Sequence, residues 1–153
     1  MTAAEIQAAI KARPDLVALL PDTAAVAAAL SVGRTRYVER LITERRIMDV
    51  LGVVAGDAFL SALEGFAAAS LAPDNPLRPV QPGFRRALAW LKSPDGIDIG
   101  SAQARALLGA LATAGIVDAA HAAVVIALAA VPDPVPEFDV RRAVFADNGT
   151  LLV

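Results

Sequence analysis

The amino-acid sequence predicts a mainly α-helical, compact multi-helix domain with a short β element around residues 36–42 and an extended C-terminal segment. Alanine supplies 35 of the 153 residues, and it has the highest intrinsic helix propensity of all residues. Residues 33–46 break this pattern, because they contain no alanine and include β-branched and aromatic residues that favour a strand. We expect a single domain over residues 1–153, since the chain is long enough to bury one core.

Helix starts are marked by side chains that can accept a hydrogen bond from a backbone N–H group within the first turn. The first is a capping box, in which Thr2 and Glu5 close the turn reciprocally. The other N-cap residues are Asp22 with Thr23, Thr43, Ser101 and Asp118. Glycines at positions 33, 52 and 115 are expected to end helices in the left-handed conformation. The expected helical segments cover residues 3–12, 15–20, 24–30, 44–51, 57–70, 83–92, 102–115, 119–131 and 136–144.

Two apolar stripes at helical spacing predict faces that pack in the core. They consist of Phe59, Leu60, Leu63 and Phe66, and of Phe84, Leu88 and Leu91. Trp90 stands beside the second stripe, and we expect it in the core as well. The last two long helices, joined by a short connection, should pack as an antiparallel hairpin.

Prolines mark the segments that cannot be helical. Residues 73–82 hold four of them and should form an extended joint between an N-terminal and a C-terminal helical half. Residues 93–100 are expected to form a turn and a loop. Pro136 suits the first position of the last, short helix.

The chain end, residues 145–153, combines a turn signal with an apolar tip. Asp147-Asn148-Gly149 favours the positive φ angles of a tight hairpin turn. Residues 143–145 fit either the end of the last helix or the first strand of this hairpin. In both cases residues 150–153 are extended. They either pair inside their own fold or add a strand to a neighbouring protein, because an exposed apolar strand edge is adhesive.

Composition narrows the possible partners. The net charge of −2 and the pI near 5.3 argue against a general affinity for nucleic acid or for an anionic membrane. The longest nearly apolar run, residues 119–131, is shorter than the roughly 20 residues of a membrane-spanning helix. The first residues carry their charges in the wrong order for a signal peptide. We therefore expect a soluble protein that does not bind a membrane.

The sequence offers little catalytic or metal-binding chemistry. There is no cysteine and one histidine, His121, whereas a structural zinc ion takes four nitrogen or sulfur ligands. Asp95 and Asp98 lack the ligand spacing of a calcium loop, and we expect them to bind their own backbone. The glycine pair of residues 52–56 is followed by Asp57 instead of a lysine, so it should not hold phosphate. We expect no enzymatic activity, no cofactor and no small-molecule substrate.

Five arginines in the segment that interrupts the alanine pattern are the first candidates for partner contact. They are Arg34, Arg36, Arg40, Arg45 and Arg46. They could form a solvated face or intramolecular pairs, bind nucleic-acid phosphate, or bind an acidic protein surface, to which arginine is well suited. The second candidate is the C-terminal strand, Thr150, Leu151, Leu152 and Val153.

Three stretches resemble a group of small, alanine-rich proteins of tailed bacteriophages and prophages. They are PDTAAVAAALSVGRTR (21–36), SPDGIDIGSAQARALLGALATAGIVDAA (93–120) and VPDPVPEFDVRRAVFADNGTLLV (131–153). These proteins are largely uncharacterised and are encoded near tail and tail-fibre genes. Their pattern has a Ser or Thr helix cap after P-D-P-V, whereas this chain has Pro136.

The resemblance implies a virion protein of the tail region, made in the bacterial host cytoplasm. Such a protein would act as a structural or accessory component, by contact with other phage structural proteins or with copies of itself in a homo-oligomer. The alternative function is a phage adaptor or regulator that binds a single protein partner and does not enter the particle. No nucleic-acid partner is expected.

Overall fold

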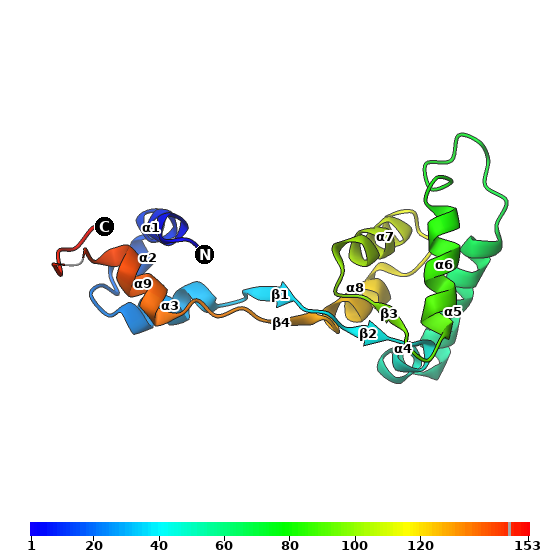
Figure 1. Cartoon of the computed structure of the whole chain (residues 1–153), viewed down its shortest axis with the longest axis horizontal. Coiled ribbons are helices and arrows are strands. Elements are labelled where there is room, and N and C mark those ends of the chain that lie inside the picture. Colours follow the sequence, from blue (N-terminus) through cyan, green and yellow to red (C-terminus); the bar gives the residue numbers. More distant parts are fainter. Residues whose placement is uncertain (147) are drawn as a thin grey trace. The chain divides into compact units, whose positions relative to one another are not determined.

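The computed structural model describes residues 1–146 and 148–153 (Figure 1). Over these residues it contains nine helices and four short strands, so the predicted mainly α-helical class is confirmed. The chain forms two compact units. Unit 1 comprises Met1–Arg36 and Val131–Val153, and unit 2 comprises Tyr37–Ala130. The proline-rich residues 73–82, expected to join two halves, lie inside unit 2.

The helices of unit 1 are α1 (Ala3–Lys11), α2 (Pro14–Val17), α3 (Thr23–Ser31) and α9 (Glu137–Val144). The helices of unit 2 are α4 (Glu44–Leu51), α5 (Val53–Ala68), α6 (Gln81–Lys92), α7 (Ala102–Thr113) and α8 (Ala119–Ala127). The strands are β1 (Thr35–Tyr37), β2 (Leu41–Ile42), β3 (Ile97–Asp98) and β4 (Ala130–Pro132). β1 pairs with β4, and β2 runs antiparallel to β3 with Leu41 opposite Asp98 and Ile42 opposite Ile97.

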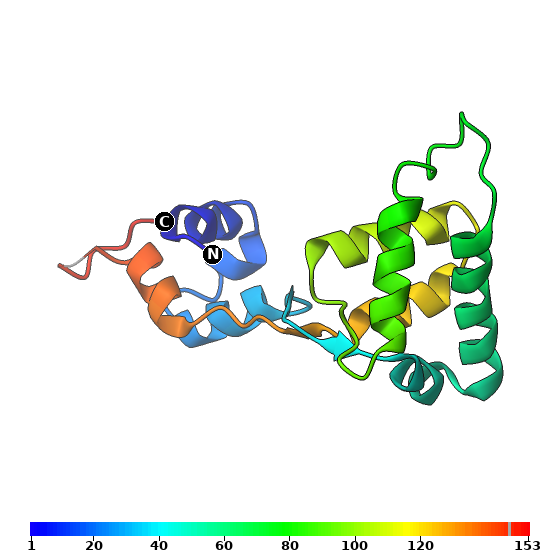
Figure 2. The same ribbon diagram turned by 45° about the vertical axis from the view of Figure 1, so that its right-hand side comes forward.

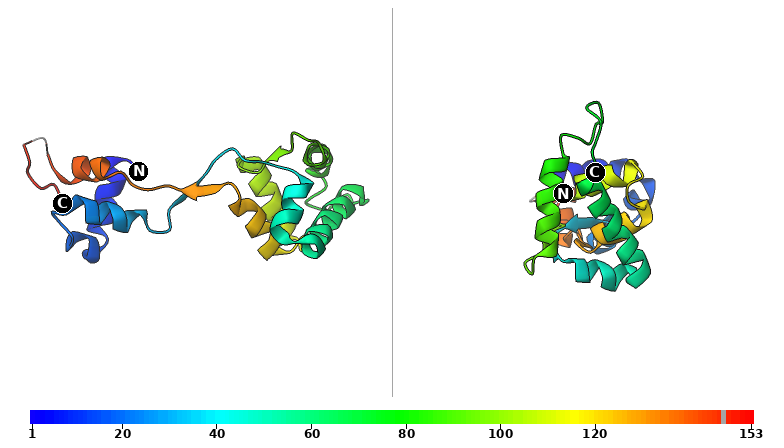
Figure 3. Two further views of the ribbon diagram at one scale, coloured as in Figure 1. Left: turned by 90° about the horizontal axis from the view of Figure 1, so that it is seen from below. Right: turned by 90° about the vertical axis from the view of Figure 1, so that its right-hand side faces the viewer.

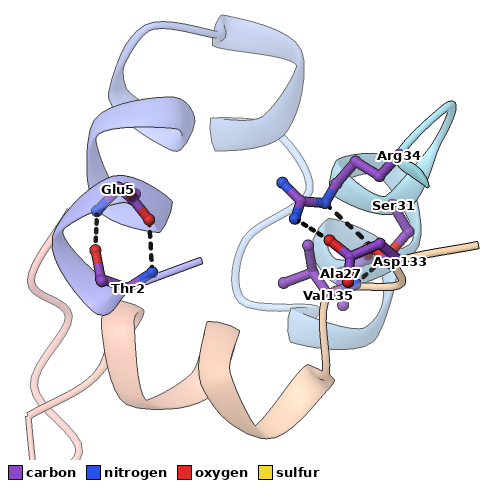
Figure 4. Close-up of polar contacts among 7 residues, drawn as sticks. All are labelled: Thr2, Glu5, Ala27, Ser31, Arg34, Asp133 and Val135. Carbon is purple, nitrogen blue, oxygen red and sulfur yellow. Dashed lines mark hydrogen bonds and ion pairs between the residues drawn. The ribbon is translucent and has the colours of Figure 1, made fainter. Parts of the chain in front are cut away.

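The predicted helix caps are present. The side-chain oxygen of Thr2 accepts a hydrogen bond from the Glu5 N–H at 3.3 Å, and the Glu5 carboxylate accepts one from the Thr2 N–H at 2.7 Å (Figure 4). The four other predicted N-cap side chains each accept a hydrogen bond from the N–H group three residues later: Asp22, Thr43, Ser101 and Asp118. The three glycines expected to end helices have positive φ angles, 72°, 83° and 70° at positions 33, 52 and 115.

The β structure differs from the prediction. Residues 36–42 form parts of two strands in two different sheets instead of one strand. Between them, Arg40 is held by Asp98, whose Oδ1 accepts a hydrogen bond from the Arg40 N–H at 2.8 Å. The expected loop 93–100 supplies β3, the partner of β2. The same Asp98 Oδ1 accepts a hydrogen bond from the Gly100 N–H at 2.8 Å, as expected for an aspartate that binds its own backbone.

Several helix boundaries also differ from the prediction, three of them with a clear local cause. α5 begins at Val53 rather than near residue 57, directly after the positive-φ glycine that ends α4. α8 ends at Ala127 rather than at residue 131, because residues 130–132 pair as strand β4. Pro136 is the N-cap of α9 rather than its first residue, with an extended φ of −63° and ψ of 137°.

The core of unit 1 is built from both ends of the chain. α9 packs against α1 and α3, as Figure 2 shows. The fully buried side chains include Ile6, Ile10, Leu16 and Val26 from the N-terminal segment and Val140, Ala143 and Val144 from α9. Apolar burial is the main favourable term in folding. The two segments of unit 1 therefore stabilise each other.

Polar contacts fix α9 at both of its ends. The side-chain nitrogen of Gln7 donates a hydrogen bond to the Ala143 carbonyl oxygen at 2.7 Å, near the C-terminus of α9. At the other end, the Thr23 hydroxyl donates to the Glu137 carboxylate at 3.0 Å. Carbonyl groups in the last turn of a helix have no partner within the helix. The Gln7 contact therefore satisfies one of them.

The core of unit 2 lies among α4, α5, α6, α7 and α8. α4 packs against α5 and α8, and α5 packs against α6 (Figure 3). The rings of Phe66 and Phe84 meet edge to face, with centroids 5.1 Å apart. Gln81 is buried, and its side-chain nitrogen donates to the carbonyl oxygens of Phe66 and Ala69 at 2.7 and 2.8 Å, which caps the end of α5. α7 and α8 pack together, as predicted for neighbours joined by a short connection.

The prediction that Trp90 belongs to the core is wrong. Phe84, Leu88 and Leu91 are buried, whereas Trp90 is 60% exposed. A helix advances by about 100° per residue. Trp90 therefore lies about 120° from the stripe of the three buried residues, although it is adjacent to Leu91 in the sequence.

Replacing Gly100 by alanine should destabilise unit 2. An added Cβ atom would overlap the backbone carbonyl oxygen of Val38, and neither backbone can move without disturbing the β2–β3 pair. Overpacking of this kind costs about 1–3 kcal/mol. We expect a loss of this size in the free energy of unfolding, measured by urea denaturation followed by Trp90 fluorescence.

Gly109→Ala is the matched control for this prediction. Gly109 lies inside α7, and an added Cβ atom there would meet nothing within 4 Å. Alanine should therefore stabilise α7 by about 0.5–1 kcal/mol relative to glycine. Equal effects of the two substitutions would contradict the close approach at Gly100.

The capping box should make the stability of α1 depend on pH. Hydrogen bonds from the Thr2 N–H and the Thr2 side chain hold the pKa of Glu5 below its ordinary value of 4.5. The folded state therefore binds fewer protons than the unfolded state near this pH. This contribution is fully present above pH 4.5 and is lost as the pH falls through the lowered pKa of Glu5. We expect Glu5→Gln to flatten the fall in melting temperature between about pH 5 and pH 3, and identical slopes would contradict this account.

Candidate partner-binding surfaces

Arg34, one of the predicted partner-contact residues, is engaged inside unit 1. Its Nη2 lies 2.5 Å from Asp133 Oδ2, and its Nε donates to the Asp133 carbonyl oxygen at 3.2 Å (Figure 4). The two side chains are each 33% exposed. Next to this pair, the Ser31 hydroxyl donates to the Ala27 carbonyl oxygen at 2.6 Å and accepts from the Val135 N–H at 2.9 Å. The intramolecular alternative therefore applies to Arg34, which joins the end of α3 to the segment before α9.

The other four predicted arginines are exposed, and they are divided between the two units. Arg36 belongs to unit 1, whereas Arg40, Arg45 and Arg46 belong to unit 2. In unit 2, Arg40 and Arg46 line a shallow hollow that also includes the exposed Leu41. Their role in partner contact stays a prediction.

The C-terminal residues pair inside unit 1. α9 runs to Val144, so the helix alternative holds for residues 143–144, and Phe145 begins the hairpin by pairing with Leu151. The Ala146 N–H donates to the Thr150 carbonyl oxygen at 2.8 Å, and the Leu152 N–H donates to the Val144 carbonyl oxygen at 2.7 Å. Gly149 has a φ angle of 81°, as the predicted turn requires. Asp147, part of that turn signal, lies outside the described residues.

This pairing leaves one edge of the C-terminal strand available. Thr150 and Leu152 direct their backbone hydrogen bonds toward residues 144–146. In an antiparallel pair, alternate residues direct these groups to opposite edges. The N–H and C=O groups of Leu151 therefore face away from the hairpin partner. Among the described residues neither group has a backbone hydrogen-bond partner, and the side chains of Leu151 and Leu152 beside this edge are each 46% exposed.

The outer surface of α9 carries three residues that the sequence did not mark as candidates. They are Phe138, Arg141 and Arg142, and all three are exposed. Phe138 is 65% exposed, and the guanidinium carbon of Arg142 lies 5.6 Å from the centre of its ring. The sequence could have indicated this exposure through the angles between residues around the helix axis. At about 100° per residue, Phe138 lies about 160° from the buried Val140.

The residues considered for chemistry are not brought together. His121 follows its cap Asp118 on the first turn of α8, with Nδ1 of the ring 3.5 Å from Asp118 Oδ1. Residues 52–56 are the glycine that ends α4 and the first residues of α5. Among residues 1–146 and 148–153, no three His, Cys, Asp or Glu side chains are grouped as metal ligands. In the same part of the chain, no helix has both the length and the apolar character that a membrane crossing requires.

Replacing Arg34 by serine should cost stability, in contrast to the same change at Arg36. Arg34→Ser breaks a half-buried ion pair and leaves Asp133 without its partner, so we expect a loss of about 1 kcal/mol in the free energy of unfolding. Arg36 is exposed, and its replacement should change this free energy by less than about 0.5 kcal/mol. Urea denaturation followed by circular dichroism measures both, and a loss at Arg36 equal to that at Arg34 would contradict the assignment.

Compared with protein-family models, with curated proteins and with solved structures, the chain matches none of them. The candidate surfaces therefore rest on the geometry of this chain. The resemblance of three of its segments to phage proteins stays a prediction.

Proposed function

We propose that the protein is a structural or accessory component of a bacteriophage particle, in the tail or tail-fibre region. It acts by binding other phage structural proteins or copies of itself. The observation that carries the binding role is the C-terminal strand of residues 150–153, whose outer edge has no backbone partner among the described residues and lies beside two half-exposed leucines. The resemblance of residues 21–36, 93–120 and 131–153 to phage proteins supports the place in a particle.

A strand edge of this kind favours a particular mode of contact. An added strand from a neighbour can bind the free N–H and C=O groups of Leu151, while the side chains of Leu151 and Leu152 pack on that neighbour. Monomeric proteins ordinarily protect such edges, because unpaired edges promote association. The edge is held in position by the two hydrogen bonds to residues 144–146. Exposed arginines are a second means of contact, since they match carboxylates on a partner surface.

The test is incorporation into particles. A phage that lacks its copy of this coding sequence is complemented with a tagged chain, and particles are purified by density gradient. We expect the tagged chain at a fixed copy number per particle. The double substitution of Leu151 and Leu152 by serine should reduce this copy number at least about fivefold, a loss of about 1 kcal/mol in association, because it removes apolar contact while keeping the hairpin backbone.

Val32→Ser is the matched control, because Val32 is an apolar residue of the same unit that is 81% exposed and lies outside the C-terminal strand. It should leave the copy number unchanged. Absence of the wild-type chain from particles would overturn the proposal and favour an adaptor that binds a single protein outside the particle. An unchanged copy number for the double variant would overturn the role of the strand edge.

A further inference from the structure

A groove on the surface of unit 1 lies beside the outer side of α9. Its floor and walls include Pro21 from the turn before α3, Phe138 and Arg141 from α9, and Phe145 from the hairpin. Its volume is about 510 Å³, within the range of roughly 300–1,000 Å³ found for ligand pockets. The groove is therefore large enough to hold several side chains of a bound peptide.

Two arginines line the groove. They are Arg141 and Arg142, and the described residues that line it include no acidic side chain. Of the acids on α9, Glu137 is bound by the Thr23 hydroxyl, and Asp139 lies with Arg142 along a different hollow. Cations in the last turn also stabilise a helix through its dipole, which explains the sign of these charges. It does not explain why they border a groove that also contains two phenylalanine rings.

The aromatic residue of the groove supplies the second observation. Phe138 is exposed on a helix whose opposite side is fully buried. Arg142 lies against its ring, at a distance where a cation and an aromatic face attract each other. Aromatic and arginine side chains dominate the binding energy of protein interfaces. Phe138 and Phe145 thus provide an apolar surface on which a partner side chain can pack, and the guanidinium groups lie beside it.

We propose that this groove binds an extended, acidic segment of a partner protein. Carboxylates of the segment would pair with Arg141 and Arg142, since a guanidinium binds a carboxylate through two parallel hydrogen bonds. An aliphatic side chain between them would pack against Phe138 and Phe145. This inference rests on the proposed function only in requiring a protein partner, and it uses a surface separate from the outer edge of residues 150–153.

Nucleic acid is a weaker match to the same groove. Phosphate binding draws its affinity from many cations along a backbone, whereas this groove has two arginines beside two phenylalanine rings. The chain as a whole carries a net charge of −2, which disfavours a polyanion at long range. A short acidic peptide with one central aliphatic residue meets both features of the groove.

The test uses the full chain and a labelled peptide, acetyl-Glu-Glu-Leu-Glu-Glu, followed by fluorescence anisotropy. The double substitution Arg141→Gln, Arg142→Gln should weaken binding at least about tenfold, because each lost charged hydrogen bond is worth more than about 1.4 kcal/mol. Phe138→Ala should weaken it about fivefold or more. Lys11→Gln, which removes one exposed charge elsewhere on unit 1, should change the dissociation constant by less than about twofold.

Further probes decide what the groove recognises. A peptide with glutamine in place of each glutamate should bind at least about tenfold more weakly. Equal binding of the two peptides, equal weakening by Lys11→Gln, or no binding of the acidic peptide would overturn the inference. Tighter binding of a single-stranded oligonucleotide would overturn it in favour of nucleic acid. Circular dichroism of each variant shows whether a loss of binding results from a loss of folding. Phe138→Ala should keep the native spectrum, because the Phe138 side chain is exposed.

The outcome is distinct from that of the particle experiment. Peptide binding that depends on Arg141 and Arg142 would stand even if the chain were absent from particles, because the two assays share no component besides the chain. Conversely, if the chain is found in particles but does not bind the acidic peptide, the proposed function stands and this inference is overturned.

Discussion

The fold of unit 1 depends on the packing of α9, from the end of the chain, onto helices from its beginning. Val140, Ala143 and Val144 are fully buried against residues such as Ile6 and Leu16. Each fully buried valine, leucine or isoleucine side chain contributes about 1.5–3 kcal/mol through burial. The entropic cost of closing a long connection rises by only about 0.6 kcal/mol for each doubling of its length. The free energy gained by burying the apolar side of α9 therefore offsets the entropic cost of closing the connection formed by residues 37–130.

This constraint also places the candidate surfaces. α9 has eight residues, fewer than an isolated helix needs for stability in water. Its form therefore depends on the core and on the contacts of Gln7 and Thr23 at its two ends. Once its inner side is fixed, the rotation of the helix is fixed, and Phe138 with the two arginines must face outward. The hairpin continues directly from α9, so the same packing positions the free edge of Leu151.

The sequence predicted the local features and missed the distant ones. Caps such as Thr2 and Asp118 were predictable because their partners lie three residues away. The pairing of Leu41 with Asp98 and of Arg34 with Asp133 joins residues far apart in the chain, and no local pattern specifies it. The prediction for Trp90 fails because neighbouring residues of a helix, such as Trp90 and Leu91, point about 100° apart. The five arginines of the predicted contact segment are close in the sequence, but they belong to two units.

The groove beside α9 escaped prediction for a related reason. Phe138 alone is an ordinary apolar residue in a short helix, and Arg141 and Arg142 alone are ordinary cations near a helix end. They become a recognition surface only because burial of Val140, Ala143 and Val144 turns all three outward and brings Pro21 and Phe145 to the same groove. The surface is thus a product of tertiary packing between the two ends of the chain. A chain that lacks either end of unit 1 lacks this groove, whatever its local sequence retains.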